Sequence, residues 1–240
     1  SNNVSFTVAL RRDNTFSNPI FPMGGSRFNF NLKFTPPYSL FDGVDYEQLS
    51  AERNEALATN DNERLADIDQ QRFDWLEFYK INFSGEWFNR LFGKLVLRKN
   101  IEFGFLGAYN NNRGIPPFER FFLGGDGLAG FAMDGREIIA LRGYPNQSII
   151  PRNRQNVTQE SFNDGATIYN KFTVDLRYPI TLNPSASIFA LAFFEAGSTF
   201  DSFREYSPFD LSRSAGGGVR IFMPQFGLLG IDFGYGFDPI

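Results

Sequence analysis

The stretch Arg120-Phe-Phe-Leu-Gly-Gly-Asp-Gly-Leu-Ala-Gly-Phe131, followed by Ala140-Leu-Arg-Gly-Tyr-Pro145, decides how the rest of the sequence is interpreted. Its glycines, among them Gly124 and Gly125, permit backbone conformations and close approaches that a side chain would prevent. We therefore expect a folded loop and not an open linker. Arg142 stands inside an otherwise nearly apolar tip. If the loop packs inside the protein, the Arg142 guanidinium needs a carboxylate partner, because an unpaired buried charge is costly. The alternative is an exposed loop cation.

The composition favours an all-β protein. The sequence has 240 residues with 30 Phe, 9 Tyr and 2 Trp, and its 23 Gly and 13 Pro indicate frequent turns. It has no apolar run long enough for a transmembrane helix, which needs about 18 or more residues. Strands of a transmembrane barrel are only about 9 to 11 residues long with one apolar face, so a barrel is compatible with these data.

The absence of Cys and His from the sequence excludes several kinds of catalytic and metal-binding site. The sequence has 0 Cys and 0 His, so disulfides, thiolate metal sites, Ser-His-Asp triads and His-ligated zinc are all excluded. Asp126 and Asp134 are more simply turn formers than a metal or acid pair. We predict no enzymatic activity, no cofactor and no metal. A net charge of −4 and a pI near 5.0 argue against nucleic acid as a partner. The start lacks a signal-peptide pattern, and we expect the sequence to be a fragment.

Alternating polar and apolar residues predict about eight strands. The clearest covers residues 26–34, where Phe28, Phe30, Leu32 and Phe34 oppose polar neighbours. The predicted strands are residues 4–12, 26–34, 73–90, 94–109, 166–179, 186–197, 212–222 and 227–237. Periodicity alone fits a soluble sandwich with its polar face in water, and equally a barrel with its apolar face in lipid.

The connections between the predicted strands alternate in length. Compact turns near residues 13–25, 89–93, 180–185 and 223–226 alternate with long connections at residues 35–72, 110–165 and 198–211. Short turns on one side and long loops on the other are typical of outer-membrane barrels, in which the short side is periplasmic. This asymmetry favours an antiparallel transmembrane β-barrel.

Two features of the sequence, residues 41–72 and the pair Trp75 and Trp87, each have two possible interpretations. Residues 41–72 are rich in charged residues and predict a partly helical extracellular insert, which is either a solvated loop or a partner-binding helix. Trp75 and Trp87 lie near the two ends of the predicted strand 73–90. They are either part of an aromatic belt at the membrane interfaces or ordinary core residues.

Several motifs resemble, in order, those of the BamA-type superfamily of outer-membrane assembly and secretion barrels. Leu141-Arg142-Gly143-Tyr144 resembles the Val-Arg-Gly-Phe/Tyr signature of that family. The turn Ile20-Phe-Pro-Met-Gly-Gly-Ser-Arg27 is similar to its Phe-Pro-x-x-Gly-Ser-Arg turn. The strand Ala192-Phe-Phe-Glu-Ala-Gly197 resembles its acidic strand, and Ser214 to Leu228 its penultimate hairpin. The resemblance spans most of the chain except residues 41–72.

The resemblance implies specific positions for the loop residues. Residues 110–165 would fold into the barrel lumen, and Arg142 would lie against an acidic residue of the facing strand. Glu195 occupies that position, where the family usually has Asp. Asp175, on the polar face of the preceding predicted strand, is a second candidate acceptor.

The resemblance also implies an architecture and a function. Residues 1–240 would be the C-terminal part of a barrel of about sixteen strands, preceded by periplasmic POTRA domains and lacking its final strand. The implied function is the insertion and folding of β-barrel proteins in the outer membrane, with lipid, nascent barrel clients and accessory lipoproteins as partners. The alternatives are a two-partner secretion pore or a TamA-like translocation factor. A porin or a barrel enzyme such as a lipase fits less well, because the chain has the Arg loop and no His.

Overall fold

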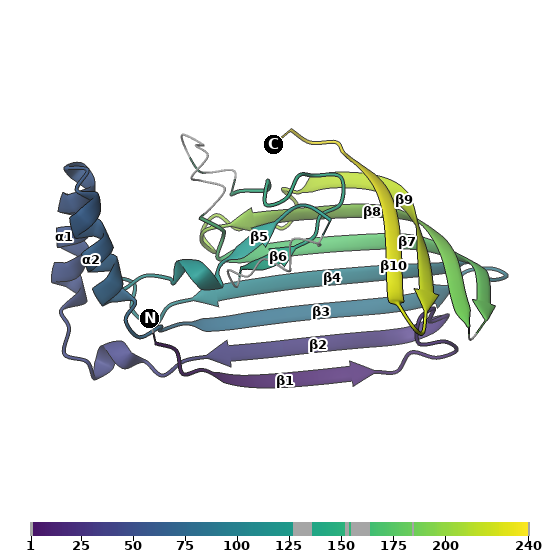
Figure 1. The fold of residues 1–240 in the computed structure, drawn as a ribbon, viewed down its shortest axis with the longest axis horizontal. Helices are drawn as coiled ribbons and strands as arrows, with labels where there is room; N and C mark the ends of the chain where they lie inside the picture. The colour runs from purple at the N-terminus through teal and green to yellow at the C-terminus, as the bar shows by residue number, and fades with distance from the viewer. Residues whose placement is uncertain (1, 127–135, 152–153, 155–163, 184, 240) are drawn as a thin grey trace.

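The computed structural model describes residues 2–126, 136–151, 154, 164–183 and 185–239. Its main element is an antiparallel sheet in which the strands follow the order of the sequence, β1-β2-β3-β4-β7-β8-β9-β10, and neighbouring strands in this order are hydrogen-bonded (Figure 1). The strands are β1 Phe6–Asp13, β2 Gly24–Phe34, β3 Tyr79–Arg90, β4 Val96–Gly107, β7 Ile168–Asn183, β8 Ala186–Phe200, β9 Ser212–Met223 and β10 Gly227–Gly236. The predicted all-β class with eight strands is confirmed.

The two faces of the sheet differ in polarity, and on central strands such as β7 the polar face is the buried one. We call the face that carries the loop between β4 and β7 the inner face, and the opposite face the outer face. On β7 the inner residues Lys171, Thr173 and Asp175 are buried, whereas Val174 and Leu176 on the outer face are exposed. A soluble sandwich buries its apolar faces instead. Buried polar and exposed apolar residues are the pattern of a barrel whose outer face meets lipid.

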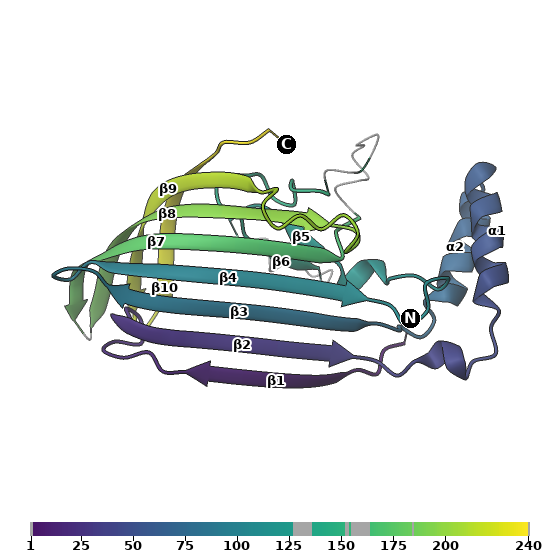
Figure 2. The same cartoon turned by 180° about the vertical axis from the view of Figure 1, so that it is seen from behind.

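The sheet is strongly curved and open. The hairpin of β9 and β10 curls over the inner face, so that β10 crosses above the plane of β2 to β4 (Figures 1 and 2). Among the described residues, β1 and β10 each pair with a strand on one side only. The sheet therefore has the form of part of a barrel.

Short and long connections lie at opposite ends of the sheet, as predicted. The turns β1–β2, β3–β4, β7–β8 and β9–β10 lie at one end, and the long connections lie at the other, with the helices (Figure 1). The helices α1 (Tyr46–Ala58) and α2 (Asn62–Arg72) form a hairpin in the predicted partly helical region. Asp45 caps α1 by accepting hydrogen bonds from the N–H groups of Glu47 and Gln48, both at 3.1 Å. Neither described helix is long and apolar enough to cross a membrane.

One strand prediction was wrong at its start. Residues 73–78 are outside β3, which begins at Tyr79. Trp75 bridges to Asn2 instead, and its ring lies 5.0 Å from that of Tyr38. Trp75 and Trp87 therefore do not mark the two ends of one strand, and the belt interpretation for this pair is not supported. Two other strands are longer than predicted, because β7 continues past a register irregularity at Pro179 to Asn183 and β8 reaches Phe200.

Candidate functional site

The loop between β4 and β7 folds onto the inner face around two short parallel strands, β5 (Phe121–Leu123) and β6 (Glu137–Ile139). A 3-10 turn, η2 (Pro117–Glu119), precedes β5, as another, η1 (Tyr38–Leu40), precedes α1. Phe121 exchanges backbone hydrogen bonds with Ala166 at 2.9 and 2.8 Å, which fixes the loop beside the start of β7. The described part of the loop is therefore folded onto the sheet, as its glycines led us to expect.

Gly124 and Gly125 form the corner after β5. Their φ angles are +122° and +92°, in the region that favours glycine. The Gly125 N–H donates to the Tyr144 carbonyl at 3.1 Å, and the Gly125 carbonyl accepts from the Leu141 N–H at 3.0 Å. A Cβ at Gly125 would overlap the Asn146 side chain. The two glycines therefore hold residues 141–144 against β5.

Apolar side chains of the loop pack against apolar side chains of the sheet. Leu123 and Leu141 are fully buried, and the Phe121 ring lies 4.8 Å from the Tyr169 ring of β7 in an edge-on arrangement. Gly104 of β4 leaves room for both rings, since a Cβ there would overlap the Tyr169 ring and lie 2.8 Å from Phe121 Cζ. The cluster contains Leu76, Phe78, Leu106, Phe121, Leu123, Ile139, Leu141, Tyr144, Ile149 and Tyr169.

Arg142 lies at the tip of this loop and contacts acidic residues from three strands. Its Nη2 is 2.7 Å from Glu195 Oε1 on β8 and 3.3 Å from Asp175 Oδ1 on β7. Its Nη1 is 3.3 Å from Asp232 Oδ2 on β10. The guanidinium also stacks over the Phe193 ring, 3.7 Å from its centroid. Sequence reasoning named Glu195 and Asp175 as acceptors and missed Asp232.

Gly143 and Tyr144 contact β10 directly. Gly143 has φ +93°, and a Cβ there would lie 2.8 Å from the Tyr235 carbonyl carbon. The Tyr144 hydroxyl donates to the Arg213 carbonyl at 2.8 Å and accepts from the Asp238 N–H at 3.1 Å. Gly234 and Gly236 of β10 provide the matching space, because a Cβ at either would crowd the loop backbone or the Tyr144 ring. Glycines on both sides therefore allow this close approach of loop and strand.

Ion pairs on the inner face connect all eight strands of the main sheet. Cations and carboxylates alternate along this series of contacts, and Arg142 links the contacts on β1 to β7 with those on β8 to β10. The pairs are Asp13–Arg27 (2.8 Å), Arg27–Glu86 (3.2 Å), Arg98–Glu86, Arg98–Asp175 (2.7 Å), Arg142–Asp175 (3.3 Å), Arg142–Glu195 (2.7 Å), Arg142–Asp232 (3.3 Å) and Arg220–Asp232 (2.6 Å). Such networks fix register more than they add stability.

The loop has a second polar attachment near β2 and β3. Lys80 of β3 is buried, and its Nζ lies 2.7 Å from Glu137 Oε2 and 2.7 Å from the Glu119 carbonyl oxygen. Lys33 of β2 pairs with Glu119 at 2.6 Å. The loop is therefore held at both halves of the sheet, near β2–β3 and at β7–β10.

A buried pair that sequence reasoning missed ties the helical hairpin to this loop. Arg113 is 2% exposed and Glu77 1% exposed, and Arg113 Nη1 lies 3.3 Å from Glu77 Oε2. Arg113 also pairs with Asp42 at 3.4 Å and lies 4.9 Å from the centroid of the Tyr46 ring. Arg113 lies in a predicted loop and Glu77 in residues 73–78, which were wrongly assigned to a strand, so the pattern of the sequence gave no signal for the pair.

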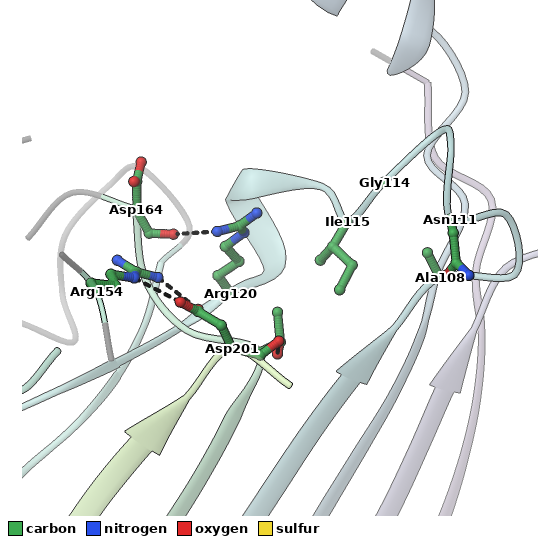
Figure 3. Close-up of a pocket in the computed structure, with 9 residues that line it drawn as sticks. Ala108, Asn111, Gly114, Ile115, Arg120, Arg154, Asp164 and Asp201 are labelled. Atoms are coloured by element: carbon green, nitrogen blue, oxygen red, sulfur yellow. Dashed lines mark hydrogen bonds and ion pairs between the residues drawn. The ribbon is translucent and has the colours of Figure 1, made fainter. Parts of the chain in front are cut away.

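A polar cavity of about 470 Å³ opens at the end with the long connections (Figure 3). Arg154 binds Asp201 through two nitrogens, at 2.8 and 2.7 Å. Burial lowers the pKa of Arg154, but the hydrogen bond and charge of Asp201 outweigh burial and raise it above its usual value. Burial lowers the pKa of Arg120, whose Nη1 donates to the Asp164 carbonyl oxygen at 3.2 Å. These paired groups form no nucleophile–base arrangement.

The described residues contain no group of three or more acidic residues placed to hold a metal ion. Asp126 is described, whereas Asp134 lies outside the described residues. The candidate site consists of the described part of the loop and the carboxylates that Arg142 contacts on β7, β8 and β10.

An open, curved antiparallel sheet with an exposed apolar outer face and a folded loop on its polar inner face defines a barrel-type protein of the outer-membrane kind. The sequence matches the Omp85 superfamily domain over residues 1–239, and the chain belongs to the Omp85 superfamily.

The fold is similar to a solved structure of BamA from Haemophilus ducreyi lacking POTRA domains 1–3. The TM-score is 0.62 at 14% sequence identity, and the match covers 98% of this chain and 39% of that one. The chain thus spans well under half of that protein. No curated protein matches the sequence.

Proposed function

We propose that this chain is part of a barrel that inserts and folds β-barrel proteins in the outer membrane, as the central subunit of an assembly machinery, without enzymatic chemistry. Membership of the Omp85 superfamily and a fold similar to BamA support a role in protein insertion or translocation. In this proposal residues 110–165 form a lumen loop, and residues 41–72 form an extracellular insert.

The observation that carries the proposal is the attachment of Arg142 to Asp175, Glu195 and Asp232. One loop residue holds β7, β8 and β10 at fixed positions, while Lys80 holds the other part of the same loop. A general porin needs an unobstructed lumen for small solutes, whereas this loop covers the inner face. The attachment suits a barrel that supports the pairing of client strands instead.

The proposed mechanism is strand addition. An incoming client strand would pair with an exposed strand edge of the barrel, with main-chain hydrogen bonds providing affinity. An unpaired strand edge is unstable in lipid, because its backbone polar groups have no hydrogen-bond partners. Pairing of a client strand with such an edge is therefore strongly favoured. The proposed partners are nascent barrel clients, accessory lipoproteins, POTRA domains of the same full-length chain, and outer-membrane lipid.

The second candidate is a two-partner secretion pore or a TamA-like translocation factor, which superfamily membership favours equally. Depletion of the full-length protein in its source cell, followed by quantification of all outer-membrane barrels, separates the candidates. An assembly factor predicts that many unrelated barrels fall together. If barrels persist while one exported protein accumulates inside, the assembly function is wrong and the protein is a dedicated secretion pore.

A further inference from the structure

The outer face of the sheet is apolar with a small number of charged exceptions. Cross-strand pairing assigns each strand residue to a face, since directly paired residues share one. All residues of the eight strands are described, and among them the charged residues with outer-face positions are Arg12, Lys99 and Arg213. All of them are cations.

These three cations differ in their partners. Arg213 binds Asp238 at 2.7 Å, at the end of the sheet with the long connections. Arg12 and Lys99 are exposed and take part in none of the ion pairs of the described residues. Both lie at the other end, because Arg12 is next to the last residue of β1 and Lys99 is in the first third of β4. A cation on an apolar, lipid-facing surface is tolerated near an interface, where it can reach an anion.

Aromatic residues complete the surface between the two cations. Trp87 of β3 is paired directly with Lys99, so the two side chains leave the same face of adjacent strands. The Trp87 ring packs on the Phe28 ring at 5.2 Å, and Phe28 is paired with Arg12. Gly85 leaves room for the indole, since a Cβ there would lie 2.9 Å from its edge. Tryptophan beside basic residues is typical of the level of lipid headgroups.

The turn between β3 and β4 lies at the same end of the sheet as Arg12 and Lys99 (Figure 1). Lys94 is exposed and takes part in none of the ion pairs of the described residues, and Phe92 in this turn is 73% exposed. We define the basic aromatic patch as Arg12, Trp87, Phe92, Lys94 and Lys99. It contains cations and aromatic rings and no carboxylate, although the whole sequence has a net charge of −4.

We propose that the basic aromatic patch binds the phosphate-bearing headgroup of an anionic phospholipid at the membrane interface beside the short turns. Lys99 and Arg12 would pair with the phosphate, Trp87 would lie at the glycerol level, and the apolar residues of β2 to β4 would contact the acyl chains. This inference goes beyond the proposed function and requires only that the outer face meets a bilayer.

Tryptophan fluorescence provides the test. The test uses the full-length protein, in which every tryptophan except Trp87 is replaced by Phe; within this sequence, which has 2 Trp, that replacement is Trp75→Phe. The protein is reconstituted in phosphatidylcholine vesicles that contain a fixed minor fraction of brominated phosphatidylglycerol or, in parallel, brominated phosphatidylcholine. The proposal predicts stronger quenching by the anionic lipid, corresponding to an enrichment of up to about fivefold for each cation. The preference should weaken at high salt, which screens exposed charges.

Variants identify the residues responsible. The double substitution Arg12→Gln with Lys99→Gln should abolish the preference, and Arg213→Gln, a change of the paired cation at the other end, should preserve it. Lys99→Arg, which keeps the charge, should also preserve it and remains informative if the double variant fails to fold. Equal quenching by the two lipids, a preference that survives the double variant, or no quenching by either lipid would each overturn the proposal.

Discussion

Arg142 binds Glu195 through both its side chain and its backbone. Its Nη2 lies 2.7 Å from Glu195 Oε1, and its backbone N–H donates to Glu195 Oε2 at 2.8 Å. One carboxylate therefore fixes the path of the loop and the direction of the guanidinium together. Because the same guanidinium reaches Asp175 and Asp232, the position of the loop is coupled to the curvature that brings β10 over the inner face.

Replacing Arg142 with Ala should destabilise the barrel or its assembly. Glu195 is 2% exposed and Asp175 1% exposed, and both would lose a counter-ion. Removal of one partner costs about 3–5 kcal/mol where the remaining buried charge has no other counter-ion. The loss here is smaller, because Arg98 still pairs with Asp175 and Lys171 lies 3.5 Å from Glu195. We expect the variant to lose heat resistance in gel electrophoresis of the folded barrel. Arg204→Ala, at an exposed loop arginine, is the control. Wild-type heat resistance and full function in Arg142→Ala would show that the loop is not pinned by this residue.

Glu195 variants should separate charge from length. Glu195→Gln keeps the shape and removes the charge, leaving Arg142 with the weaker contacts at 3.3 Å to Asp175 and Asp232. Glu195→Asp keeps the charge but is one methylene shorter, so it should not reach both the backbone N–H and the Nη2 of Arg142. We expect unfolding midpoints in the order wild type, Asp, Gln, with a loss of about 1–3 kcal/mol for Gln. A Gln variant as stable as wild type would contradict a charge-based attachment.

Alternation placed Asp175 and Lys171 on one face of a predicted strand. The proximity of Arg142 to Glu195 followed from the resemblance to the BamA-type superfamily, together with the need of a buried cation for a carboxylate. Asp232 was not accessible from the sequence, because it meets Arg142 only through the curl of β9 and β10 over the inner face. Sequence periodicity does not contain that curvature.

The start of β3 shows a second limit of prediction from sequence alternation. Phe73 and Trp75 have the parity of the strand residues that follow, so alternation extended the strand too far. The backbone of residues 74–76 pairs with Asn2 instead, a contact between distant parts of the chain. The pairing of Arg113 with Glu77 could not be predicted from the sequence either, because it depends on where two irregular segments meet in space.

The Arg113–Glu77 pair should determine how firmly the helical hairpin is attached. Arg113→Met would leave Glu77 as an uncompensated buried carboxylate and remove the contacts with Asp42 and Trp75. We expect faster hydrogen exchange and proteolysis in α1 and α2, with the Arg142 contacts retained. Combining Arg113→Met with Glu77→Gln should recover part of the loss, because no unpaired buried charge then remains. Additive effects of the two substitutions would show that the pair is not coupled.

Gly143→Ala should separate the loop from β10, and the chain offers a close control. Gly143 has φ +93°, and its added Cβ would lie 2.8 Å from the Tyr235 carbonyl carbon and 2.9 Å from the Gly236 nitrogen. Gly93 also has a positive φ, +56°, but nothing lies within 4 Å of its added Cβ. Both substitutions carry the backbone strain of alanine at positive φ, about 1 kcal/mol, and only Gly143→Ala adds a clash with backbone atoms. We therefore expect Gly93→Ala to assemble normally and Gly143→Ala to lose heat resistance. Equal behaviour of the two variants would mean that the contact between loop and β10 contributes little to the stability of the barrel.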